Sequence, residues 1–446
     1  MSQVIDPSTT LIPGFSAGNA FSAWKTERAR ALARHTAFGL PTHRDEEWKY
    51  TSVRGLAAVD WQFVSTANLT GENLAGPSLM ADAIQLVFVN GRFAPELSSA
   101  ASAIPGLTAI SLATAVESHP DLVRQYLMQA TLLEDQSFPV TAHLGRLGKP
   151  GADTFAALNT ATFVDGAFIH VARNAKLDRP IHVRHLTAGD RPAAAPRLLV
   201  IVEEGADAQV LESYESVQDG PSFVTPVAEV FVGRNARLEH VRLQDENLLA
   251  THIGTTDVRA EADASYLHYQ VVFGGHLTRH DLNGFLNGTN LHARMDGVIA
   301  LSGDQLADNH TRLDHAFAHG DSFQVYKHVL AERSTAVFNG KIFVHQDAQK
   351  TDAKQTNQAL LLSSEATMNT KPQLEIFADD VKCTHGATVG QLDDLPLFYL
   401  RTRGLPQVQA RGLLVYAFAA EVLERISHPG LRDALEAKLL AKLNQV

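Results

Sequence analysis

The single cysteine of this 446-residue chain lies two positions before a histidine, in the stretch DDVKCTHGATVG. A thiolate and an imidazole are both ligands for iron and zinc. If this stretch is a strand, the alternation of side chains places Cys383 and His385 on one face, with Lys382 and Thr384 on the other. Such a pair supplies two ligands where a tetrahedral centre takes about four, so a metal site here requires a second contributor, such as another chain docked at the strand edge. The alternative is a small buried hydrophobic residue, which the C-x-H spacing alone does not exclude.

A second group of ligand-type residues spans 308–328, DNHTRLDHAFAHGDSFQVYKH, in which four histidines accompany Asp308, Asp314 and Asp321. Imidazoles and carboxylates together suit a metal site. Their irregular spacing does not converge on one tetrahedron and favours histidines on strand faces with local hydrogen bonds. No ligand set is predicted there.

The elements that must position these residues begin with a mainly helical N-terminal domain, predicted over residues 1–160. Apolar residues at helical spacing predict an amphipathic helix over 19–35, and ESHPDLVRQYL and DTFAALNTA also have helical patterns. The charged segment LPTHRDEEWKYT is expected on the surface, anchored by Trp48 and Tyr50. In IQLVFVNGRF the turn pair Asn90-Gly91 predicts a small hairpin.

Residues 161–390 are predicted to form a β body, because short Val-, Ile-, Leu- and Phe-rich segments replace the helical patterns there. Small residues recur at turn-like positions, in most cases about 30 residues apart, as expected for stacked coils. Neighbouring coils bury a continuous interior that one coil cannot bury alone, and open edges remain only at the two ends. A β-sandwich is the alternative architecture. The small turn residues are Ala175, Ala206, Ala236, Ala262, Gly288, Ser334 and Ala366.

Residues 391–446 are predicted to form a C-terminal helical domain. Two apolar stripes with a four-residue spacing are separated by the stop signal SHPG. Packing against the β body is the usual fate of such stripes, and docking of a partner is the alternative. The stripes consist of Leu414, Phe418, Val422 and Ile426, then Leu431, Leu435, Leu439 and Leu443.

Composition narrows the function classes. The formal net charge of −11 disfavours nucleic acid or an anionic membrane as a general partner, and no apolar run has the length of a membrane span. The N-terminus lacks a secretory pattern and one cysteine cannot form a disulfide framework, so a reducing cytoplasm is expected. No phosphate loop, G-x-S-x-G elbow, H-E-x-x-H or dinucleotide fingerprint occurs. ATPase activity in this chain is therefore not expected.

Two C-terminal segments, QKTDAKQTNQALLLSSEA (residues 349–366) and KPQLEIFADDVKCTHGATVGQLDDLPLFYLRTRGL (residues 371–405), resemble the signature of the SufB/SufD family of iron–sulfur cluster assembly proteins. LPTHRDEEWKYT and ALNTATFVDGAFIHVARNAKLDRPIHVRHL are similar to the SufD branch, so the likeness covers most of the chain. The SufB branch usually carries several cysteines. The single cysteine here makes SufD the closer resemblance.

This resemblance implies a right-handed parallel β-helix flanked by helical domains. It implies a heterodimer with the SufB paralogue through the end of the β-helix, and docking of the ATPase SufC on the C-terminal helical domain. A homodimer is a further possibility for the isolated chain. Iron or a nascent cluster would then be handled at the SufB–SufD interface by His385, with Cys383 beside it, and no cofactor would be bound tightly by the chain alone. The residues expected to meet SufC are Leu395, Phe398, Tyr399, Arg403, Leu414 and Phe418.

The sequence leaves two alternative functions open. One is a polysaccharide lyase or esterase on a β-helix scaffold, although acidic loops such as LEDQ and QLDD form no obvious catalytic pair. The other is a homodimeric cluster scaffold like SufB, for which two chains would supply only two thiols.

Overall fold

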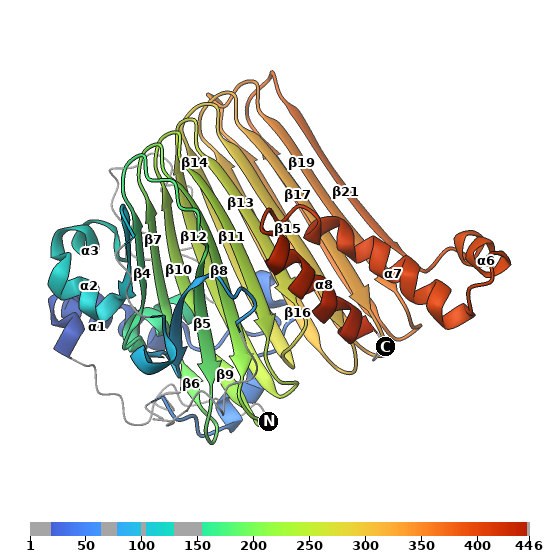
Figure 1. Cartoon of the computed structure of the whole chain (residues 1–446), viewed down its shortest axis with the longest axis horizontal. Coiled ribbons are helices and arrows are strands. Elements are labelled where there is room, and N and C mark those ends of the chain that lie inside the picture. The colour runs from blue at the N-terminus through green and yellow to red at the C-terminus, as the bar shows by residue number, and fades with distance from the viewer. Residues whose placement is uncertain (1–18, 64–77, 100–103, 129–153, 444–446) are drawn as a thin grey trace.

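The chain folds as a two-sheet β-solenoid with helices at both ends of the sequence (Figure 1). The computed structural model describes residues 19–63, 78–99, 104–128 and 154–443. The expected parallel β-helix with helical flanks is therefore confirmed, and the alternative β-sandwich is wrong, because nearly every strand pairs in parallel with strands one coil before and one coil after it. The domain boundaries expected from the sequence remain predictions.

The first sheet has ten strands. Only its first pair is antiparallel, and this pair is the predicted hairpin, in which Asn90 and Gly91 adopt the positive φ values of 48° and 77° that such a tight turn requires. In spatial order the strands are β2 (Arg92–Phe93), β1 (Ile84–Val89), β5 (Ile181–Thr187), β8 (Asp207–Ser216), β11 (Arg237–Asp245), β13 (Ser265–Val272), β15 (His292–Leu301), β17 (Asp321–Leu330), β19 (Asp352–Leu361) and β21 (Lys382–Gly390).

The second sheet faces the first across the interior of the solenoid. The main path runs β20 (Thr367–Ile376), β18 (Thr335–Val344), β16 (Leu306–His315), β14 (Leu277–Asn287), β12 (Ala250–Glu261), β10 (Val227–Val232), β7 (Arg197–Val202), β4 (Gly166–Val171) and β3 (Leu107–Ser111). Two short strands, β6 (Ala193–Ala194) and β9 (Ser222–Val224), pair with each other, and β9 also pairs with β12 of this sheet.

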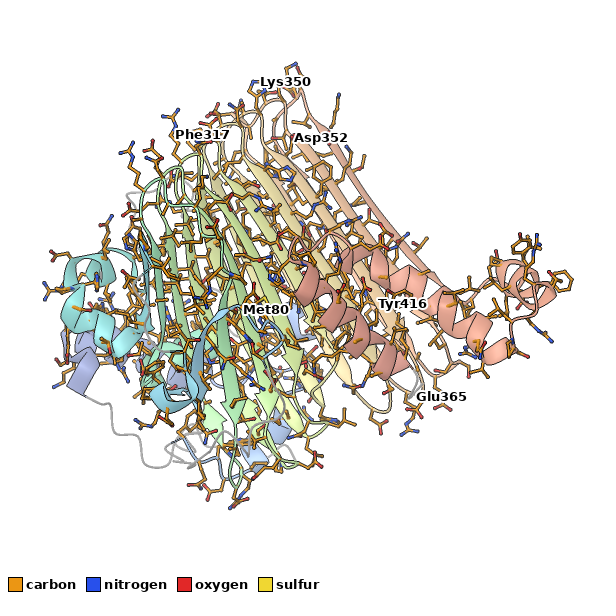
Figure 2. All side chains as sticks on the ribbon, in the orientation of Figure 1. Met80, Phe317, Lys350, Asp352, Glu365 and Tyr416 are labelled. Carbon is orange, nitrogen blue, oxygen red and sulfur yellow. The ribbon has the colours of Figure 1, made fainter. Side chains whose placement is uncertain are left out.

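The small turn residues noted in the sequence lie at two different corners of the coils. Ala175, Ala206 and Ala236 stack at one corner, where the amide of the following coil donates to the carbonyl of each in turn. Ser334 and Ala366 lie at the other corner, where the chain passes from the first sheet to the second. The irregular spacing of these residues therefore reflects a change of corner within a regular stack. Figure 2 shows the rims formed by the corners, with Lys350 and Asp352 at one and Glu365 at the other.

Helices of the N-terminal part cover the early coils. They include the predicted amphipathic helix, which ends before Gly39, and the helix predicted from DTFAALNTA, in which every residue is buried. These elements are η1 (Asn19–Trp24), α1 (Lys25–Phe38), η2 (Glu46–Trp48), η3 (Arg54–Ala58), η5 (Pro95–Leu97), α2 (Leu112–Ser118), α3 (Pro120–Tyr126) and α5 (Thr154–Thr162).

Three helices follow the last coil: α6 (Asp394–Thr402), α7 (Gln407–Leu423) and α8 (Pro429–Leu443). The last two pack on the outer face of the first sheet, whereas α6 projects beyond the end of the solenoid (Figure 1). Ile426 and the predicted leucines of α8 form an apolar layer with Val298 and Val329 of the sheet. None of the helices in the described ranges combines the length and apolar character that crossing a membrane requires.

Candidate functional site

The final coil of the solenoid leaves two strand edges open. β20 pairs with β18 and β21 pairs with β19, and among the described strands neither is paired on its outer side. Every residue of β21 is exposed except Cys383, which is partly buried. The unpaired backbone groups of such edges are sites for strand addition by another chain. The cysteine-containing strand is therefore accessible to a neighbouring subunit.

Cys383 and His385 both belong to the inward face of β21, as the alternation rule predicts. Cys383 packs against an apolar group that includes Ile342, Ala353 and Ala378, which places its side chain toward the interior. His385 follows two residues later and is exposed, because no further coil covers it. The thiol and the imidazole are thus presented together at the open end of the solenoid.

The protonation of Cys383 follows from this position. Burial raises the pKa of the thiol, the nearby Asp352 carboxylate raises it further, and a backbone hydrogen bond with Ala353 opposes them. In the isolated chain the sulfur is therefore held mainly as a thiol at neutral pH. A metal ion or cationic group brought to this edge would favour the thiolate, which is the form that ligates iron.

The histidines of residues 308–328 do not come together. His310 lies on the outer face of β16, His315 and His328 lie on inward faces of different sheets, and His319 is exposed at a corner. Within the described ranges, no group of three or more histidine, cysteine, aspartate or glutamate side chains is placed to hold a metal ion.

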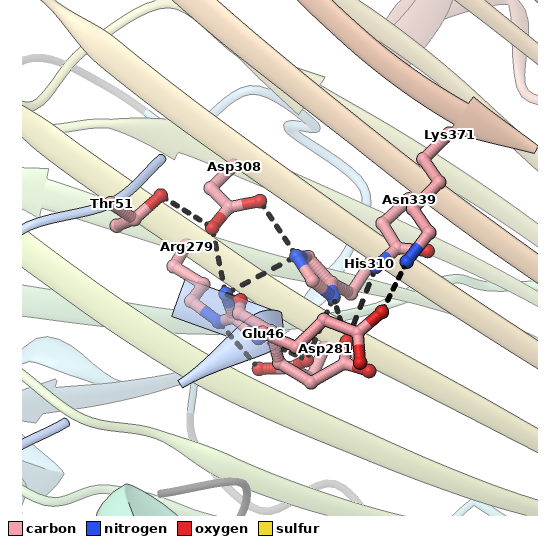
Figure 3. Close-up of polar contacts among 9 residues, drawn as sticks. Glu46, Thr51, Arg279, Asp281, Asp308, His310, Asn339 and Lys371 are labelled. Carbon is pink, nitrogen blue, oxygen red and sulfur yellow. Dashed lines mark hydrogen bonds and ion pairs between the residues drawn. The ribbon is translucent and has the colours of Figure 1, made fainter. Parts of the chain in front are cut away.

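His310 instead fastens the N-terminal segment to the solenoid (Figure 3). Its Nε2 lies 2.9 Å from a carboxylate oxygen of Asp308, and its Nδ1 lies 3.1 Å from Glu47 of the charged N-terminal segment. Arg279 donates to Asp308 at 2.7 Å and to the Glu47 carbonyl at 2.6 Å, and its guanidinium lies 3.9 Å from the ring centre of Trp48. We call this group the N-terminal clasp.

The clasp reaches the end of the solenoid. Asn339 on β18 donates to Glu47, and Lys371 on β20 forms a 2.6 Å ion pair with Glu46. Trp48 is the buried anchor that the sequence predicts, but Tyr50 is 47% exposed. The expectation of two aromatic anchors was therefore wrong for Tyr50, because the ion pairs on the sheet take the place of a second apolar contact.

The residues predicted to meet an ATPase divide into two groups. Leu395, Phe398 and Tyr399 on α6 are 72%, 64% and 56% exposed, and Arg403 stacks on Tyr399 with its guanidinium 5.2 Å from the ring centre. Two further apolar side chains on α7, Val408 and Leu413, are 83% and 47% exposed. No residue of α6 is buried in the chain. We call these exposed apolar residues of α6 and α7 the α6 patch.

Leu414 and Phe418, the other two predicted contacts, are half-buried. Phe418 packs against the apolar layer beneath α7, and Lys327 of β17 lies 4.6 Å from its ring centre. Phe418 is thus positioned to connect α7 to the sheet. The assignment of all six residues to a partner surface remains a prediction.

Sequence reasoning overlooked a polar ladder inside the solenoid. Gln324, Gln355 and His385 occupy the same inward position on β17, β19 and β21, one coil apart. Both glutamines are 1% exposed. Their spacing of 31 and 30 residues matches the coil length, so aligning the chain with itself at this period would have found them.

Comparison with known proteins agrees with this architecture. Residues 185–418 match the family model described as SUF system FeS cluster assembly, SufBD core domain, and residues 17–183 match that of the SufBD protein N-terminal region. The chain is 33% identical to the iron-sulfur cluster assembly protein SufD of Escherichia coli, with 95% of each chain covered. It is 36% identical to an iron-sulfur cluster assembly SufBD family protein of Synechocystis, over 89% of this chain and 86% of the relative. The chain therefore belongs to the SufBD family of iron–sulfur cluster assembly proteins, as a homologue of SufD.

Proposed function

We propose that this chain is a non-catalytic subunit of a cytoplasmic iron–sulfur cluster assembly complex. The observation that carries the proposal is the open final coil, which presents Cys383 and His385 at an edge where another chain can add a strand. Iron and sulfide are the substrates handled at this edge. The thiolate and the imidazole supply two ligands, and a cysteine-bearing SufB partner supplies the others.

Strand addition explains why the pair needs a partner. Docking along β21 satisfies its unpaired backbone groups and covers the exposed His385. The same docking encloses the thiol and the imidazole in a drier site, which protects the thiol from oxidation before iron arrives. In the absence of SufB, two copies of this chain would pair through the same edge as a homodimer.

The α6 patch is the proposed docking site for the SufC ATPase. A helix with no residue buried in its own chain and three large apolar side chains exposed is typical of a surface covered by a partner. Movement of α6 reaches the solenoid through α7, where Glu421 forms a 2.6 Å ion pair with Lys327, and through Arg425 just after this helix, which forms one of 2.6 Å with Asp296. ATP-driven closure of the partner would then shift the solenoid and expose the cluster edge.

Replacing His385 by alanine tests the cluster role. In cells that depend on this chain, H385A is expected to keep its partners through purification and to lose maturation of iron–sulfur enzymes. The matched control is His276→Ala, which removes another exposed imidazole far from β21 in the sequence. Normal enzyme maturation with H385A would contradict the proposed role of the imidazole.

A further inference from the structure

Gln355 lies next to His385 within the solenoid. The two residues are register partners on β19 and β21, so their backbones lie about 4.8 Å apart, and both belong to the inward face. The corresponding neighbour of Cys383 is Ala353, which has no polar side-chain atom. His385 thus has a hydrogen-bonding side chain beneath it that Cys383 lacks.

The side-chain amide of Gln355 is held through its nitrogen, Nε2. Its Nε2 donates to Gln324 Oε1 at 3.2 Å, and the same oxygen accepts a hydrogen bond from Thr311 at 2.7 Å. The opposite sheet leaves space for the amide at Gly340, where an added Cβ would lie 2.3 Å from Gln355 Nε2. The side chain is therefore held by hydrogen bonds and by close packing.

The oxygen of the same amide, Oε1, has no hydrogen-bond partner among the described residues. Gln355 Oε1 is buried, and no side chain or backbone group in the described ranges donates to it. Because Nε2 is directed to Gln324 in the preceding coil, the carbonyl oxygen remains for the coil on the other side, which is β21. His385 is the register partner of Gln355 on β21, and its ring N–H is a donor that could reach this oxygen.

We propose that Gln355 is a positioning residue for His385. It accepts a hydrogen bond from one ring nitrogen, which fixes the tautomer and the ring orientation and leaves the other nitrogen as the ligand for iron. Histidine ligands in proteins commonly donate their second ring N–H to a carbonyl or carboxylate in this way. The inference rests on the proposed function for the role of the ring, but the hydrogen bond is a property of the isolated chain.

The test compares three variants. Gln355→Met removes the acceptor while keeping the side-chain length, and Gln324 Oε1 retains its bond from Thr311. Gln355→Glu retains an acceptor oxygen. Gln358→Met is the matched control, since Gln358 is on the outward face of the same strand and half-exposed.

The readout is the tautomer of His385 in the isolated chain, measured by nitrogen-15 NMR of the imidazole and assigned by difference from H385A. One tautomer is expected to dominate in the unmodified chain, in Q355E and in Q358M, whereas Q355M should show a mixture of both. The same tautomer in Q355M and in the unmodified chain would overturn the proposal, as would a mixture already present in the unmodified chain.

A second readout separates this inference from the proposed function. In the assembled complex, Q355M is expected to slow cluster formation by roughly 10- to 100-fold, the usual cost of losing such an outer partner. If Q355M changes the tautomer but not the rate of cluster formation, the hydrogen bond between Gln355 and His385 in the unmodified chain is supported and the role of the imidazole as a ligand is refuted. An unchanged tautomer with slowed cluster formation would refute the positioning role itself.

Discussion

Replacing His310 by glutamine tests what holds the N-terminal clasp on the solenoid. Burial and the Arg279 guanidinium lower the pKa of His310, but the carboxylates of Asp308 and Glu47 outweigh them, so its pKa lies above the ordinary value of 6.5. The raised pKa means that the imidazolium form stabilises the clasp. This stabilisation is complete below about pH 6.5 and is lost as the pH rises through the higher pKa of the folded chain.

The size of the effect follows from the partners that remain. A hydrogen bond to a charged group contributes about 1.5–3 kcal/mol when both groups are buried. The Glu47 side chain is 29% exposed, so water compensates part of its loss. Asp308 keeps Arg279 and Thr51 as partners and is not left as an isolated buried charge. We therefore expect H310Q to destabilise the clasp by about 2 kcal/mol at pH 6, which is roughly a 30-fold change in its opening equilibrium.

Hydrogen–deuterium exchange of the segment 45–51, corrected for the intrinsic effect of pH, measures this opening directly. The control is His276→Gln, because His276 is exposed and has no role in the clasp. Protection in H310Q should fall at pH 6 and approach that of the unmodified chain at high pH, while H276Q should match the unmodified chain throughout. Equal protection in H310Q and the unmodified chain at pH 6 would refute the reasoning, as would a loss that grows with pH.

Three further outcomes are expected. The rate of Cys383 alkylation in the isolated chain should rise with pH at a midpoint above that of an unstructured cysteine peptide, because burial raises the pKa of the thiol; a midpoint at or below that of the peptide would contradict this. Leu395→Asp on the α6 patch should abolish capture of the ATPase without a change in melting temperature, whereas Leu248→Asp, at another exposed leucine, should change neither. Ile426→Ala, in the segment that joins α7 to α8, should cost about 2–5 kcal/mol in a denaturant titration, and a cost near zero would show that this segment is not packed on the sheet as described.

Local sequence patterns predicted the fold and the placement of Cys383 and His385 on one face of a strand. The small residues that recur at the corners indicated stacked coils, and the alternation of β21 placed Cys383 and His385 together. The Asn90-Gly91 turn was also predictable, since it depends on the conformations of two adjacent residues. Each of these features can be recognised from a short segment or from its recurrence along the chain.

Contacts between distant segments were not predictable from the same patterns. Glu47 and His310 are separated by 263 positions, and no local periodicity associates them. The ladder from Gln324 to Gln355 was overlooked because it depends on the register of successive coils, which patterns within one strand do not show and which an alignment of the chain with itself at the coil length would have revealed. The half-buried state of Phe418 depends on which face of α7 meets the sheet, and Lys327 at that face is a residue of the β body.

The attachment of α7 limits the motion that the proposed ATPase partner could transmit to the proposed cluster site at β21. α7 contacts β15 and β17, and β19 lies between them and β21 in the sheet. A pull on α6 therefore acts on strands that are paired on both sides, where separating one strand would break a full row of backbone hydrogen bonds. The solenoid should consequently move as one body, and the partner contact at β21 should rotate or part as a unit. Exchange protection of the β19–β21 pairing should thus be unchanged between nucleotide-free and ATP-bound complexes. Selective loss of that protection with ATP would instead indicate that β21 peels away from β19.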